Sequence, residues 1–156
     1  MTREHKVAKS AVMAFLLLGG APSALAGAWG FGSFENDDAL DWVADLERAS
    51  GLQLIDSTLR HIDTKAKSIE APDCSLAASE VVAAARGSPA KTVPSEVSAW
   101  ITRVHPIVSA ELLAAARSAV AACRDGRHSE LRELWQDSKD ARSWLNDTAN
   151  LLQRLK

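Results

Sequence analysis

The chain has 156 residues, with 18 basic and 20 acidic side chains and a formal net charge of −2. This length suits one domain with a sizeable core. The charge gives no support for nucleic-acid binding, which needs a concentrated basic surface, so we expect no nucleic acid among its partners.

Residues 1–26 have the three parts of a secretory signal peptide. Basic residues precede a short apolar stretch, residues 11–18, and the sequence Ala-Leu-Ala at residues 24–26 fits the small-x-small cleavage pattern. Cleavage between Ala26 and Gly27 predicts a periplasmic or secreted protein. The apolar stretch is far shorter than the ~20 residues that cross a bilayer, so we expect no stable membrane anchor after cleavage.

The part after the signal sequence begins with glycines and aromatic residues, GAWGFGSF, and continues with an acidic run, ENDDALDWVADL. This opening resembles that of the domain of unknown function 4259, an uncharacterised bacterial family. Its members typically begin Met-Gly-Ala-Trp-Gly and continue with Phe-Glu-Asn-Asp-Asp-Ala-Leu-Asp-Trp. Residues 78–84, 94–100 and 130–135 also resemble this family, so the resemblance covers essentially all of residues 27–156. It implies an all-helical fold and, because the family is uncharacterised, no particular activity.

The rest of the sequence predicts a compact, single all-α domain of about seven short antiparallel helices after an irregular Gly/aromatic leader. Period-2 alternation is missing, and the helix-favouring Ala, Leu, Glu and Arg dominate. Short connections between amphipathic helices favour antiparallel neighbours. Asn36 or Ser33, Ser109, Ser129 and Asp140 are expected as N-caps. The expected helices cover about residues 37–49, 52–65, 72–87, 95–104, 110–124, 130–135 and 141–155.

Four aspartates fall on one side of the first expected helix: Asp37, Asp38, Asp41 and Asp45. They are interpreted first as a solvated or internally paired face, because the helix dipole favours acids in the first turn. The dipole does not account for Asp45, and like charges four residues apart repel. The alternative is a surface that selects a basic partner. The spacing does not fit a calcium-binding loop.

The aromatic residues of the leader, Trp29, Phe31 and Phe34, are costly to leave in water. We expect them to pack onto the helices, with Phe34 near Leu40 as a hydrophobic staple. The alternative is an exposed aromatic arm that docks onto a partner, since Trp and Phe often anchor interfaces.

Both cysteines, Cys74 and Cys123, follow the signal sequence. An even number of cysteines in a small exported domain favours a disulfide, and both residues share a helix face with apolar neighbours. We therefore expect a Cys74–Cys123 bond.

Catalytic and metal-binding motifs are absent from the sequence: it has no HExxH, GxSxG or Cys-His signature and no zinc-ligand spacing. We expect no catalytic residue, metal or cofactor. His105, before a proline, is interpreted as a helix cap. Glu80 and Glu111 lie in alanine-rich helices, where a buried carboxylate would mark a candidate site, although glutamates are usually exposed.

The resulting hypothesis is an exported binding module with an unknown protein partner, rather than an enzyme. Its contact surface would join the aromatic leader to the acidic helix face. One alternative is an immunity-type protein that neutralises an envelope toxin, and another is an enzyme whose site is built from dispersed carboxylates.

A group of basic residues lies near the junction of the fifth and sixth helices. These residues could interact favourably with the helix dipole or pair with the aspartates. The members of this basic group are Arg117, Arg124, Arg127, His128 and Arg132.

Overall fold

The computed structural model describes residues 28–60, 72–124 and 129–156, and every regular element in these ranges is an α-helix. Ala28 and Asn36 form an isolated antiparallel bridge. The predicted all-α fold is confirmed, and none of the described helices is long and apolar enough to cross a membrane. The helices are α1 (Asp37–Arg48), α2 (Gln53–Arg60), α3 (Pro72–Ala85), α4 (Ser95–Val104), α5 (Ala110–Arg124), α6 (Glu130–Gln136) and α7 (Ala141–Arg154).

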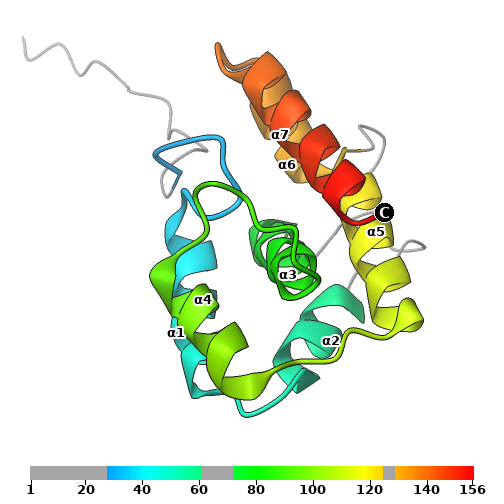
Figure 1. The fold of residues 1–156 in the computed structure, drawn as a ribbon. Coiled ribbons are helices and arrows are strands. Elements are labelled where there is room, and N and C mark those ends of the chain that lie inside the picture. Colours follow the sequence, from blue (N-terminus) through cyan, green and yellow to red (C-terminus); the bar gives the residue numbers. More distant parts are fainter. Residues whose placement is uncertain (1–27, 61–71, 125–128) are drawn as a thin grey trace, which may run out of the picture.

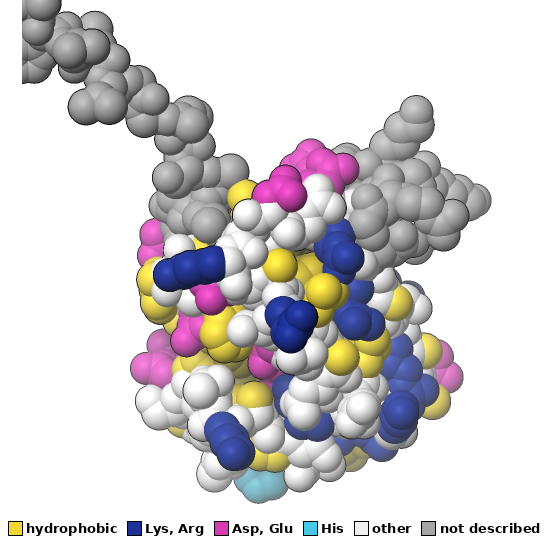
Figure 2. Space-filling model, turned by 90° about the horizontal axis from the view of Figure 1, so that it is seen from above, with side chains coloured by type: hydrophobic (Ala, Val, Ile, Leu, Met, Phe, Trp, Pro, Cys, Tyr) yellow, Lys and Arg dark blue, Asp and Glu magenta, His cyan; other side chains and the backbone are white. Residues whose placement is uncertain are grey.

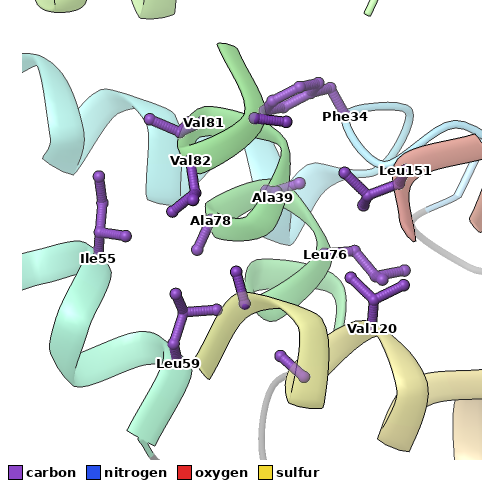
Figure 3. Close-up of a cluster of buried hydrophobic side chains, with 14 of the residues drawn as sticks. Phe34, Ala39, Ile55, Leu59, Leu76, Ala78, Val81, Val82, Val120 and Leu151 are labelled. Atoms are coloured by element: carbon purple, nitrogen blue, oxygen red, sulfur yellow. The ribbon is translucent and has the colours of Figure 1, made fainter. Parts of the chain in front are cut away.

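Helix α3 forms the centre of the fold, where α1, α2, α4, α5 and α7 all contact it (Figure 1). Its sequence is rich in alanine, and residues 75–83 are all buried. A helix that is apolar on nearly every side is stable only when other helices enclose it. In Figure 3, Ala78 and Val82 of α3 face Ile55 and Leu59 of α2 within this core.

Helix α1 buries one apolar stripe, which includes Trp42 and Leu46. The indole N–H of Trp42 donates a hydrogen bond to Thr58 Oγ1 of α2 at 2.9 Å, which fixes the two helices against each other. Asn36 is the N-cap, as expected: its Oδ1 accepts a hydrogen bond from the backbone N–H of Ala39 at 2.7 Å.

Helix α4 packs on α1 through Trp100, which is 1% exposed and donates its indole N–H to the carbonyl of Ala49 at 2.9 Å. The helix ends at His105, whose φ of 50° is left-handed. The backbone N–H of His105 donates to the carbonyl of Ile101 at 2.9 Å, so this residue caps the helix as predicted.

The predicted N-caps Ser109 and Ser129 each accept a hydrogen bond from the first turn of the following helix. The prediction for Asp140 is confirmed for its position but not for a side-chain hydrogen bond. Asp140 lies at the N-cap position of α7, but its side chain accepts no cap hydrogen bond. Its backbone N–H instead donates to Ser138 Oγ at 3.2 Å, within a turn that already sets the start of the helix.

Several predictions lie outside the described residues. The signal sequence and its cleavage point between Ala26 and Gly27 are among them, as is the end of the predicted second helix at residues 61–65. The same holds for Arg127 and His128 of the basic group.

Candidate functional site

Residues 28–36, here called the leader loop, fold around the side chain of Glu35. The backbone N–H of Trp29 donates to the carbonyl of Glu35 at 3.0 Å, and the N–H of Glu35 donates to the carbonyl of Gly32 at 2.9 Å. The N–H of Gly32 donates to Glu35 Oε2 at 2.8 Å. A Cβ atom on Gly30 would lie 2.1 Å from the same oxygen. The glycines therefore provide the space in which the Glu35 carboxylate sits.

Replacing Gly30 with alanine should lower the free energy of unfolding by about 1–3 kcal/mol, because the added methyl group must displace Glu35. Gly32→Ala should cost less, since its Cβ would lie 3.1 Å from Glu35 Oε2. Urea unfolding of the two variants measures the difference. A larger loss for Gly32→Ala would contradict this description of the loop.

The leader loop separates its three aromatic residues. Phe34 is 7% exposed, and its ring points toward α3 in the core (Figure 3). Trp29 and Phe31 are 60% and 40% exposed, so the expectation that all three pack onto the helices is wrong for these two. The staple with Leu40 is wrong as well, because Leu40 is 41% exposed whereas Phe34 turns inward. The hydrogen bonds around Glu35 fix the path of the loop and so decide which rings face solvent.

The four aspartates of α1, Asp37, Asp38, Asp41 and Asp45, are all exposed. Asp45 pairs with Arg48 one turn along the same helix. Within the described parts of the chain, no ion pair joins these aspartates to the basic residues of α5 and α6.

One of those basic residues, Arg117, instead donates to the carbonyls of Leu155 and Lys156 at 2.6 and 2.8 Å. On the face shown in Figure 2, basic side chains are most frequent at the right, and acidic ones lie mainly at the left and upper edges. On this face, acidic and basic side chains are therefore concentrated in different places.

The two cysteines are free thiols, so the predicted Cys74–Cys123 disulfide is wrong for this structure. The Sγ of Cys74 donates to the carbonyl of Asp38 at 3.7 Å, and that of Cys123 donates to the carbonyl of Pro72 at 3.8 Å. Each thiol thus faces a different backbone carbonyl. Burial raises the pKa of Cys74 to about 11 and the pKa of Cys123 to about 12, so both stay protonated and unreactive at neutral pH.

Of the two glutamates in alanine-rich helices, Glu80 is buried and Glu111 is exposed. Glu80 is 2% exposed, and both of its oxygens accept hydrogen bonds from the guanidinium of Arg154, Oε2 at 2.7 Å from Nη1. Arg154 Nη1 also donates to the carbonyl of Ser88 at 3.2 Å, and Nε donates to Asn150 Oδ1 at 2.8 Å. A bidentate pair of this kind fixes the geometry of both side chains.

Next to this pair, an open pocket of about 440 Å³ lies at the meeting point of three segments, and we call it the Asp147 pocket. The leader loop contributes Phe31 and Glu35. The connection between α3 and α4 contributes residues 89–92, and α7 contributes Asp147, Asn150 and Arg154. Sequence reasoning identified Phe31 and the buried Glu80 as candidates but missed the polar residues of α7.

Asp147 is the carboxylate of this pocket whose hydrogen-bonding capacity is least used. Among the residues that the structure describes, none donates a hydrogen bond to it. Its pKa is raised to about 6, first because burial disfavours the charged form and then because the Glu80 carboxylate lies nearby. Arg154 opposes the shift and Glu35 adds to it. Asp147 therefore carries its charge at neutral pH at a cost in free energy.

Asp147→Asn should consequently stabilise the protein at pH 7.5. A rise in pKa from 3.8 to about 6 corresponds to at most about 3 kcal/mol, which solvent screening at this partly exposed site reduces to about 1 kcal/mol. The folded wild type binds the proton more tightly than the unfolded chain. The contribution of Asp147 to stability is therefore most favourable below pH 3.8, and it becomes less favourable as the pH rises through 6.

Urea unfolding of wild type and Asp147→Asn at pH 4 and pH 7.5 tests the sign. The advantage of the variant should appear only at the higher pH, and Asp41→Asn, at an exposed position, serves as the control. An advantage that is the same at both pH values would contradict the proposed cause.

The described residues contain no group of three or more His, Cys, Asp or Glu side chains that could hold a metal ion. Two carboxylates from different segments and an aromatic ring line one opening instead. Such an arrangement can pair with a positively charged group or exchange a proton near neutral pH.

Comparison with known proteins gives a family but no activity. No curated protein and no solved structure matches the chain. The family model described as Domain of unknown function (DUF4259) matches residues 27–147, which include the leader loop, the buried Glu80 and Asp147. Because the match extends over most of the sequence, the chain belongs to this family.

Proposed function

We propose that the protein is an exported binding module that contacts a basic partner protein through its leader loop. The observation that carries this proposal is the 60% exposure of Trp29 on a loop that is held in place by the hydrogen bonds around Glu35. A large ring on a preorganised loop loses little conformational entropy on binding and can bury a large apolar area.

The charge of the neighbouring helix supports a basic partner. Asp37, Asp38 and Asp41 are exposed directly after the leader loop and form no ion pair with the other residues that the structure describes. Exposed carboxylates of one sign speed the approach of a basic partner and disfavour an acidic one. Asp45 contributes less, since its carboxylate already pairs with Arg48.

Capture of proteins from an envelope extract tests the proposal. Immobilised wild-type protein should retain a basic protein that Trp29→Ser loses. Ile107→Ser provides a matched control, because Ile107 is 87% exposed and lies away from the leader in sequence. Both variants should remain folded. Equal retention by wild type and Trp29→Ser would refute the proposed contact.

Export is part of the same proposal and rests on the signal-like sequence of residues 1–26. Intact mass spectrometry of the protein from the producing cell should give a chain that begins at Gly27. A full-length chain in the cytoplasm would contradict export.

An enzyme with dispersed carboxylates is the second candidate, and the Asp147 pocket favours it. Glu35 and Asp147 come from separate segments, and a carboxyl group with a pKa of about 6 suits a general acid. The effect of Asp147→Asn separates the two functions. An enzyme would keep its affinity for substrate and lose turnover, whereas a binding module would show no turnover in either form.

A further inference from the structure

The two cations of the Asp147 pocket, Arg154 and Lys91, differ in how far they are free to bind a ligand. Arg154 has five N–H donors, and four of them are engaged by Glu80, Ser88 and Asn150. A single N–H remains, too few for the bidentate recognition of a carboxylate or phosphate. Lys91, at the exposed edge of the pocket, makes no ion pair with the described carboxylates. Among the residues that line the pocket, Lys91 is thus the cation left for an anion, and the nearby carboxylates of Glu35 and Asp147 would repel that anion.

The carboxylates leave negative charge unmatched. Three carboxylates face the site: Glu80 of α3, Glu35 of the leader loop and Asp147 of α7. Two cations, Arg154 and Lys91, also face it. One oxygen of Glu35 is held by the N–H of Gly32, and Glu80 is held by Arg154. Asp147 alone has no donor among the described residues, and a partly buried carboxylate without one is costly.

The pocket wall provides an apolar surface beside this charge. Phe31 and Pro89 both line it, and Phe31 is 40% exposed. An aliphatic stem can pack on such a surface while its charged end reaches a carboxylate, and a guanidinium or ammonium group is also attracted to the face of an aromatic ring. Lysine and arginine side chains combine both parts.

We propose that the Asp147 pocket binds a lysine or arginine side chain of the partner protein. Its charged end pairs with the carboxylate of Asp147, and its stem packs on Phe31. This inference deepens the proposed function and rests on it, because the side chain is presented by the partner that Trp29 contacts. Phe31 joins the two surfaces, since it belongs to the leader loop and also lines the pocket.

Nuclear magnetic resonance titration of the full chain with Nα-acetyl-arginine methylamide tests the pocket directly. The neutral comparator is Nα-acetyl-citrulline methylamide, which has nearly the same shape without the charge. The arginine derivative should bind in the millimolar range and shift the resonances of Phe31 and Asp147. The dissociation constant of the citrulline derivative should be higher by a factor of about ten or more.

Two variants should change the affinity for the arginine derivative in opposite directions. Asp147→Asn, which should fold at least as well as wild type, is expected to weaken binding of the arginine derivative about tenfold. Lys91→Gln removes a repelling charge and should strengthen binding about twofold to fivefold. Lowering the pH from 7.5 to 5 should weaken binding to wild type, as Asp147 takes up a proton, and should have no such effect on Asp147→Asn.

Equal binding of the two derivatives, or unchanged binding by Asp147→Asn, would overturn the inference. Its failure is distinguishable from that of the proposed function. The small derivatives report on the pocket alone, whereas retention of the partner by Trp29→Ser reports on the leader loop.

Discussion

Arg154→Met should lower the free energy of unfolding by about 3–5 kcal/mol, because it leaves the carboxylate of Glu80 buried without a partner. Glu80 is 2% exposed, and Asp147 next to it adds a second negative charge rather than relief. Urea unfolding at pH 7.5 measures the loss. The same variant should also loosen the α3–α4 connection, since Arg154 Nη1 donates to the carbonyl of Ser88.

The double variant Glu80→Met/Arg154→Met is the matched control. Apolar side chains of similar volume often replace a buried ion pair at little or no cost, so the double variant should be more stable than Arg154→Met alone. With the single variant Glu80→Met completing the cycle, the departure from additivity measures the coupling between the two residues. Losses that simply add would show that the pair does not act as a unit.

Trp100→Ala should have an effect of similar size, about 3–5 kcal/mol, because it empties a fully buried site between α4 and α1. Trp100→Phe should cost much less, since it keeps most of the ring area and gives up the hydrogen bond to Ala49. Thermal and urea unfolding of both variants provide the comparison. If Trp100→Ala cost no more than Trp29→Ala at the exposed ring, Trp100 would not hold α4 against α1 as described.

The helices could be predicted from the sequence because their boundaries depend on local chemistry. Asn36, Ser109 and Ser129 satisfy the first N–H groups of their helices through side chains only three residues away. The apolar stripe of α1 likewise follows from its 3.6-residue period. Asp140 is the exception, because a turn through Ser138 sets the start of α7 instead.

The Asp147 pocket could not be predicted in the same way, because it depends on three segments that meet only in the folded chain. The sequence indicated that Glu80 lies in an apolar helix, but not that Arg154 would reach it from α7. Asp147, Asn150 and Arg154 share one helix face by their spacing, which a sequence alone cannot distinguish from a solvated face.

The cysteine and aromatic predictions illustrate a related difficulty. Cys123 does point inward, as its apolar neighbours indicate, yet two inward-facing thiols need not face each other. Trp29, Phe31 and Phe34 are chemically alike, and their different exposures follow from the turn around Glu35. In both cases the deciding information is the path of the backbone rather than the residue type.

The most direct measurement is a carboxyl-carbon nuclear magnetic resonance titration of Asp147, with and without saturating Nα-acetyl-arginine methylamide. In the free protein the pKa of Asp147 should be about 6, because the partly buried carboxylate has other carboxylates nearby and no described hydrogen-bond donor. The bound cation should lower this pKa by favouring the charged form. A pKa at the ordinary value of 3.8 in both samples would contradict the claim that Asp147 is unpaired in the free protein and pairs with a bound basic group.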